Sequence, residues 1–122
     1  MKTTTAYRSL NTTTVSLETE YIEQLKRGDE RAARELYQLH ARPLYNTLLR
    51  LVVDQGEAQD LLQETFITAF RKIDSYRHEA PFGAWIRRIA VNTGLDYLRR
   101  RKLYFESVNE EVDKHLPEVE SV

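Results

Sequence analysis

The residues best suited to chemistry lie in one stretch of the C-terminal half, where aromatic, arginine and asparagine side chains alternate. This stretch contains Phe82, Trp85, Arg87, Arg88 and Asn92. Aromatic rings stack on exposed bases, guanidinium groups contact phosphates, and an amide can donate to and accept from a base edge. The combination favours binding of single-stranded nucleic acid. The alternative is that Phe82 and Trp85 are core residues and the arginines only face solvent.

The charge distribution points to the same stretch. The chain has a formal net charge of −1, but residues 71–102 contain nine lysines and arginines against three acids. The segment after residue 102 reverses this balance, with six acids and one lysine. Such asymmetry indicates a polyanion-binding segment followed by an acidic tail, or else an ordinary solvated surface helix. Charge alone leaves both interpretations open.

The residue types that most enzymes need are missing or scattered. The four glycines form no phosphate-binding loop, there is no cysteine, and the three histidines lie far apart. Asp60 and Glu64 have helical spacing, but acids in the first half of a helix also favour its dipole. His40 lies on an apolar helix face, where we expect a satisfied core residue rather than a ligand. We therefore expect no enzyme, metal, cofactor or small-molecule substrate.

Nothing in the sequence predicts membrane insertion or secretion. No apolar run approaches the roughly 20 residues that span a bilayer. The N-terminus has no apolar segment after its lysine, so it does not match a secretory signal. We expect a cytoplasmic protein.

Hydrophobic periodicity predicts an all-α fold, a small helical bundle of about four helices. The expected helices are residues 18–27, residues 29–52 with Asp29 as the cap and a kink or short break at Pro43, a third after an Asp54 cap, and residues 82–102. The expected apolar stripe of the second helix comprises Ala33, Leu36, Tyr37, His40, Leu44, Leu48, Leu51 and Val52. In the fourth helix, the residues expected to face inward are Phe82, Trp85, Ile86, Ile89 and Ala90, followed by Val91, Leu95 and Leu98. The domain boundaries that follow are a flexible segment 1–16, a helical domain 17–102 and an acidic linker or tail 103–122.

Two motifs carry a family resemblance. Residues 60–66 (DLLQETF) with 70–73 (FRKI), and residues 82–93 (FGAWIRRIAVNT) with 96–98 (DYL), follow each other across a short loop. In type and spacing they resemble the polymerase-docking and promoter-melting helices in region 2 of extracytoplasmic-function sigma factors, which belong to the sigma-70 family. The resemblance extends over residues 21–102.

The resemblance implies two partners. The third helix would bind the clamp helices of the largest subunit of the RNA polymerase core, through Asp60, Gln63, Glu64 and Thr68. The loop and fourth helix would capture promoter DNA at the minus-ten element, mainly as the non-template single strand. The implied DNA-binding residues are Arg77, His78, Phe82, Trp85, Arg87, Arg88, Asn92, Asp96, Arg99, Arg100, Arg101 and Lys102.

An anti-sigma factor is a further expected partner. The alternative function is a stand-alone helical interaction module that binds an anti-sigma factor without promoting transcription. Gly94 departs from the family pattern, because relatives often have alanine there. The family's second domain, a helix-turn-helix that reads the minus-thirty-five element, has no counterpart in these residues. We expect the chain to be a piece of a longer protein, with a natural single-domain relative as the alternative.

Overall fold

The structure, a computed structural model, describes the backbone of residues 17–115 and the side chains of residues 17–111. It contains a first helix over residues 17–26, α2 (Glu30–Val52), α3 (Gln55–Arg71), a 3₁₀ turn η1 (Ile73–Ser75) and α4 (Phe82–His115). No strand occurs in this part of the chain. The all-α prediction is confirmed. The predicted flexible segment 1–16 and the end of the predicted tail, residues 116–122, lie outside the described residues.

Local capping chemistry explains where α2 and α3 begin. The Asp29 carboxylate accepts a hydrogen bond from the Arg31 backbone N–H at 2.9 Å, and Asp54 accepts one from Glu57 N–H at the same distance. Such bonds satisfy the N–H groups that a first helical turn leaves without partners. Gly28, with φ of 91°, provides the left-handed residue that follows the first helix. Both predicted caps are confirmed.

The core lies where α2, α3 and α4 pack against one another. α2 is continuous through Pro43, and the buried row of Leu36, Leu44 and Leu48 runs across it without a change of register. Of the two expected alternatives, the short break is therefore absent, and the kink stays a prediction. The sequence prediction was also wrong at the start of this helix, where Ala32 is buried and Ala33 only partly so.

α4 contributes a row of buried residues spaced four apart, Phe82, Ile86, Ala90 and Gly94. Their size falls steadily along the row. At Gly94 a Cβ atom would lie 3.0 Å from Leu51 Cδ1 and 3.3 Å from Leu48 Cδ2, both on α2. Gly94 therefore marks a close approach of α4 to α2.

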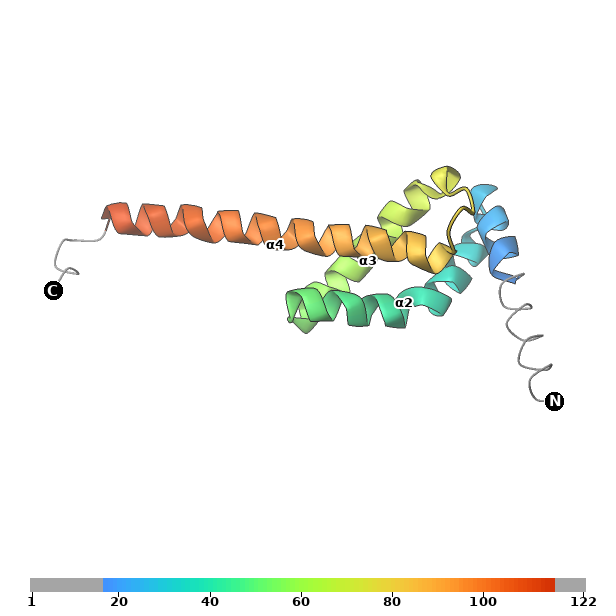
Figure 1. The fold of residues 1–122 in the computed structure, drawn as a ribbon, viewed down its shortest axis with the longest axis horizontal. Coiled ribbons are helices and arrows are strands. Elements are labelled where there is room, and N and C mark those ends of the chain that lie inside the picture. Colours follow the sequence, from blue (N-terminus) through green and yellow to red (C-terminus); the bar gives the residue numbers. More distant parts are fainter. Residues whose placement is uncertain (1–16, 116–122) are drawn as a thin grey trace.

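Beyond Leu98, α4 leaves the bundle and continues as a projecting helix to His115 (Figure 1). The predicted helix end at Lys102 was wrong, because a change of charge does not stop a helix. Between residue 102 and residue 115 there is neither glycine nor proline, and glutamate, lysine and leucine are good helix formers. Leu95, predicted to face inward, is 45% exposed, whereas Tyr97 and Leu98 farther along α4 still pack against the core, so Leu95 lies on the outward side of the helix. Within the described residues, no helix combines the length and apolarity needed to cross a membrane.

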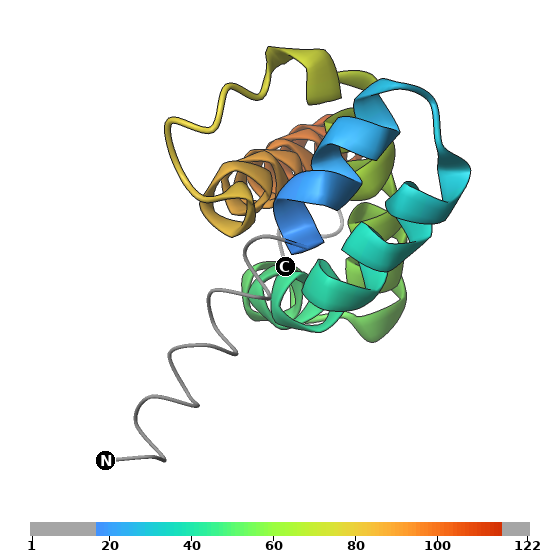
Figure 2. The same ribbon diagram turned by 90° about the vertical axis from the view of Figure 1, so that its right-hand side faces the viewer.

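The first helix lies across the end of the bundle at which α4 begins (Figures 1 and 2). Ile22 enters the core, and Glu18 contacts the imidazole of His40 on α2. The His40 ring also packs against Phe82, with 5.1 Å between ring centroids. His40 is thus a structural residue with its polar atom satisfied, as expected from the sequence.

The packing at Gly94 makes a testable prediction. Gly94→Ala should change the free energy of unfolding by less than about 1 kcal/mol, because the gain in helix propensity opposes a mild clash with a flexible leucine. Gly94→Ile should destabilise by about 2 kcal/mol or more, because the buried Leu48 cannot move aside. Urea denaturation measures both. Adding Leu51→Ala should recover part of the Gly94→Ile loss, and strict additivity of the two changes would refute the contact.

Candidate nucleic-acid interface

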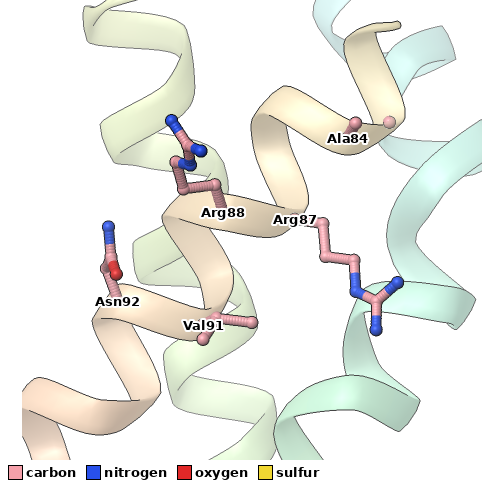
Figure 3. A pocket seen from close by; sticks show the side chains of 6 residues that line it. Ala84, Arg87, Arg88, Val91 and Asn92 are labelled. Atoms are coloured by element: carbon pink, nitrogen blue, oxygen red, sulfur yellow. The ribbon is translucent and has the colours of Figure 1, made fainter. Parts of the chain in front are cut away.

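The face of α4 that points away from the core carries a shallow depression lined by Gly83, Ala84, Arg87, Arg88, Val91 and Asn92. Figure 3 shows that Arg88 and Asn92 extend to one side of the helix, whereas Arg87 extends to the other, toward α2. All three side chains are exposed. Small and apolar residues thus form a floor between two flanks that carry guanidinium and amide groups.

Arg88 and Asn92 make no hydrogen bond or ion pair with any described residue. Asn92 also borders a second groove, between α3 and α4, which is lined by Glu64, Thr68, Lys72, Ile89, Asn92, Thr93 and Asp96. Residues assigned by resemblance to polymerase binding (Glu64, Thr68) and to DNA binding (Asn92, Asp96) therefore form two walls of one groove.

An aromatic cluster precedes this face. Tyr76 is buried, and its ring lies 5.1 Å from that of Trp85 and 5.6 Å from that of Phe82. Trp85 is only partly buried and lies outside the lining of the depression. Phe82 is 2% exposed. The expected contact between Phe82 and DNA is therefore corrected: its ring is a core element, since stacking on a base requires an exposed face.

The loop between η1 and α4 is fixed by hydrogen bonds through Tyr76. The Tyr76 hydroxyl donates to the Ala80 carbonyl at 2.6 Å, and its own carbonyl accepts from Lys26 Nζ of the first helix at 3.0 Å. Burial, and secondarily the nearby Glu18 carboxylate, raise the pKa of Tyr76, so the hydroxyl stays protonated and keeps donating at neutral pH.

His78 gives the loop a second connection to the first helix. Its backbone has φ of 61°, in the left-handed region, and its ring lies 4.6 Å from that of Tyr76. Its Nε2 atom is 3.2 Å from Glu23 Oε1. Between the loop and the first helix lies a hollow of about 430 Å³, whose lining includes Ile22, Tyr76 and His78. Arg77, the other predicted DNA-binding residue of the loop, is exposed.

The predicted cationic run follows on the projecting part of α4. Arg99, Arg100, Arg101 and Lys102 are all exposed. Arg99 pairs with Asp96 at 3.5 Å, and the Arg101 guanidinium lies 5.3 Å from the centre of the Phe105 ring. Because consecutive helical residues point about 100° apart, the four cations surround the helix and do not share one face.

The outer face of α3 carries the predicted polymerase-binding residues. Asp60, Gln63 and Glu64 are exposed, and Thr68 is half-buried. Ile67 lies among them at helical spacing and is 52% exposed. Sequence reasoning missed Ile67, although its position seven residues after Asp60 places it on this face.

Sequence reasoning also missed the surface of α2 next to α4. Arg42, Asn46 and Arg50 line a hollow there together with Arg87 of α4. Their spacing of four residues places them on one face of α2 and could have been seen in the sequence. A search for apolar periodicity does not detect such a polar row.

Known proteins share this arrangement. The family model for sigma-70 region 2 matches residues 36–104. The RNA polymerase sigma-H factor of Pseudomonas aeruginosa is 38% identical over 80 residues, which cover 66% of this chain and 42% of that protein. The sigma factor SigW of Bacillus subtilis is 35% identical over 81 residues, covering 66% of this chain and 43% of that protein. The chain thus spans about two fifths of the length of these relatives.

A solved structure has the same fold. It is an NMR structure of an engineered region 2 of sigmaE in complex with GTAAAA, with a TM-score of 0.66 and 32% sequence identity. The superposition covers 70% of this chain and 88% of that one. The chain belongs to the sigma-70 region 2 family, and its helical bundle is a region 2 domain of the extracytoplasmic-function sigma factors.

Proposed function

We propose that this domain docks on the clamp helices of the RNA polymerase core and captures the non-template single strand of the minus-ten promoter element in transcription initiation. The observation that carries the proposal is the solvent face of α4, where Arg88 and Asn92 have no partner among the described residues. Unpaired cations and amides beside an apolar floor suit a strand that offers phosphates and bases.

Docking is proposed for the face of α3 that bears Asp60, Gln63, Glu64 and Thr68. Its acids complement a basic partner, and the exposed Ile67 adds an apolar centre of the kind that protein interfaces bury. The two proposed surfaces meet at the groove between α3 and α4. A polymerase bound to α3 would therefore lie next to DNA bound to α4.

The proposal includes a cytoplasmic location, since the domain would act where RNA polymerase and DNA are found. An anti-sigma factor that covers either surface would silence the domain. The alternative function, an interaction module that binds an anti-sigma factor without promoting transcription, makes a different prediction for DNA. Such a module would show no dependence of binding on base sequence.

The first test of this proposal concerns docking. Asp60→Lys with Glu64→Lys should weaken binding to an isolated clamp fragment of the polymerase by about tenfold or more, since attraction becomes repulsion. The matched control is Glu20→Lys with Glu35→Lys, which changes the net charge equally at exposed positions elsewhere. Circular dichroism should show an intact fold for both variants. Equal weakening by the two pairs would rule out the proposed surface.

A second test concerns the cationic run. Each duplex phosphate contact adds about 0.9 to the slope of log affinity against log salt. Because the four cations point in different directions, we expect about two contacts, so replacing all four by glutamine should reduce the slope by about 2. Exchange of Arg31 and Arg34 for glutamine on α2 should leave it unchanged. A slope that survives the fourfold replacement would mean that these residues only solvate α4.

The third test concerns base recognition. Asn92→Ala should weaken binding of a single-stranded minus-ten oligonucleotide by about 1–3 kcal/mol, the usual contribution of a good base contact. The loss should depend on the base at one position, whereas Arg88→Ala should weaken all sequences alike. Asn109→Ala, an exposed asparagine farther along α4, is the matched control. Titrations with oligonucleotides substituted at each position measure whether the loss of affinity depends on the base. A uniform loss, or no loss, would exclude Asn92 as a reader of bases.

A further inference from the structure

The hollow between α2 and α4 has the composition of an anion-binding groove. It occupies about 480 Å³, and three arginines line it: Arg42 and Arg50 of α2, and Arg87 of α4. No aspartate or glutamate is among its lining residues. Within the described residues none of the three guanidinium groups has a hydrogen bond or an ion pair. Three neighbouring cations without an acid repel one another, and a bound anion would remove that repulsion.

The spacing on α2 explains how the groove is built. Arg42, Asn46 and Arg50 are four residues apart, so they follow one edge of the helix over about 12 Å. All three are exposed. Thr47 lies beside them, and its hydroxyl donates to the Pro43 carbonyl at 3.1 Å. A linear row of cations and an amide suits an extended anion better than a compact one.

The groove is continuous with the proposed recognition face. Gly83 and Arg87 line both hollows. Figure 3 shows Arg87 reaching from α4 toward α2, away from Arg88 and Asn92. His40, at the inner wall, is held by Glu18 and packs on Phe82, so the wall is a fixed part of the core. At Gly83 a Cβ atom would lie 3.4 Å from His40 Cε1, so the backbone of α4 itself lies against this wall where the two hollows meet.

We propose that this groove binds the phosphodiester backbone of the single strand whose bases the α4 face reads. The inference rests on the proposed function and extends it to α2. Arg42 and Arg50, on α2, contact two phosphates of the strand, and Arg87 contacts the strand's backbone next to Gly83. Asn92 and Arg88 keep their role on the opposite side of α4. The groove contributes affinity that is independent of sequence, since phosphates are the same at every position.

The test uses the whole chain and single-stranded oligonucleotides. Arg42→Gln with Arg50→Gln should lower the slope of log affinity against log salt by about 1.4, from two contacts at about 0.7 each. The ratio of affinities between the preferred oligonucleotide and its base-substituted forms should stay unchanged. Arg31→Gln with Arg34→Gln removes the same charge from exposed positions on the same helix outside the groove and should leave the slope as it is.

A second measurement locates the contact. Replacing one phosphate at a time by an uncharged methylphosphonate should weaken binding by the wild-type chain at the linkages that the groove holds. The Arg42/Arg50 variant should be insensitive at those same linkages. If wild type and variant respond alike at every linkage, or if the Arg31/Arg34 control lowers the slope equally, the groove does not bind the strand.

The outcomes separate this inference from the proposed function. Base-dependent binding that requires Asn92, with a slope unaffected by the Arg42/Arg50 change, would overturn the groove alone. Absence of any single-strand binding by the wild-type chain would overturn both. An Arg42/Arg50 variant that loses binding to the whole polymerase core, but keeps its binding to the clamp fragment and its salt slope on DNA, would show that the groove instead meets an acidic protein surface.

Discussion

The contact of α4 with α2 determines how the rest of the domain is arranged. The buried row on α4 shrinks from Phe82 through Ile86 and Ala90 to Gly94, where a Cβ atom would lie 3.0 Å from Leu51 Cδ1 of α2. That row uses one face of α4 for the core. The opposite face is consequently open to solvent, and the residues between the two faces point either toward α2, as Arg87 does, or away from it, as Arg88 and Asn92 do (Figure 3). The position of the proposed binding surfaces on α4 therefore follows from which face of the helix packs in the core.

A second constraint acts at the other end of the row. The loop before α4 has no regular secondary structure, yet its buried residue Tyr76 is held by a backbone carbonyl within the loop and by Lys26, fifty residues earlier in the chain. The first helix thereby joins an element made early in the sequence to the start of α4. Glu18 on His40 and Glu23 near His78 strengthen the same junction. A loop supported in this way can present Arg77 in a defined position without a core of its own.

Features determined by local chemistry were predictable from the sequence, and features determined by where the bundle ends were not. The caps Asp29 and Asp54 were predictable because an N-cap depends on a side chain and the next few N–H groups. The length of α4 was missed because periodicity describes a helix but does not show where its packing partners stop. The exposure of Leu95 was missed because an apolar residue type does not by itself fix which side of the helix faces the core. Ala33 was preferred to Ala32 because alanine carries too weak a hydrophobic signal to fix the phase of a stripe.

The residues of the candidate interface also differ in how far the sequence predicted them. Arg87, Arg88 and Asn92 were found from their types and spacing, and the structure leaves them exposed. Phe82 was assigned to DNA from its type and from the family resemblance, with a core position as the alternative. Its burial depends on Tyr76 and His40, which come from other elements. Arg42 and Arg50 escaped notice because their significance lies in the nearness of Arg87, a relation between two helices that no single segment reveals.

The unbroken course of α4 has a mechanical consequence. Its 34 residues correspond to a rod about 50 Å long, of which the first part is clamped in the bundle and the rest is free (Figure 1). Along such a rod, the position of a residue in the sequence determines the direction in which its side chain points about the helix axis. Inserting or deleting one residue between Gly94 and Arg99 would advance or retract the cationic run by about 1.5 Å and turn it by about 100° about the axis. Exchanges of side chains in this segment should therefore be tolerated far better than changes in its length, since only the latter alter the phase between the two surfaces of the helix.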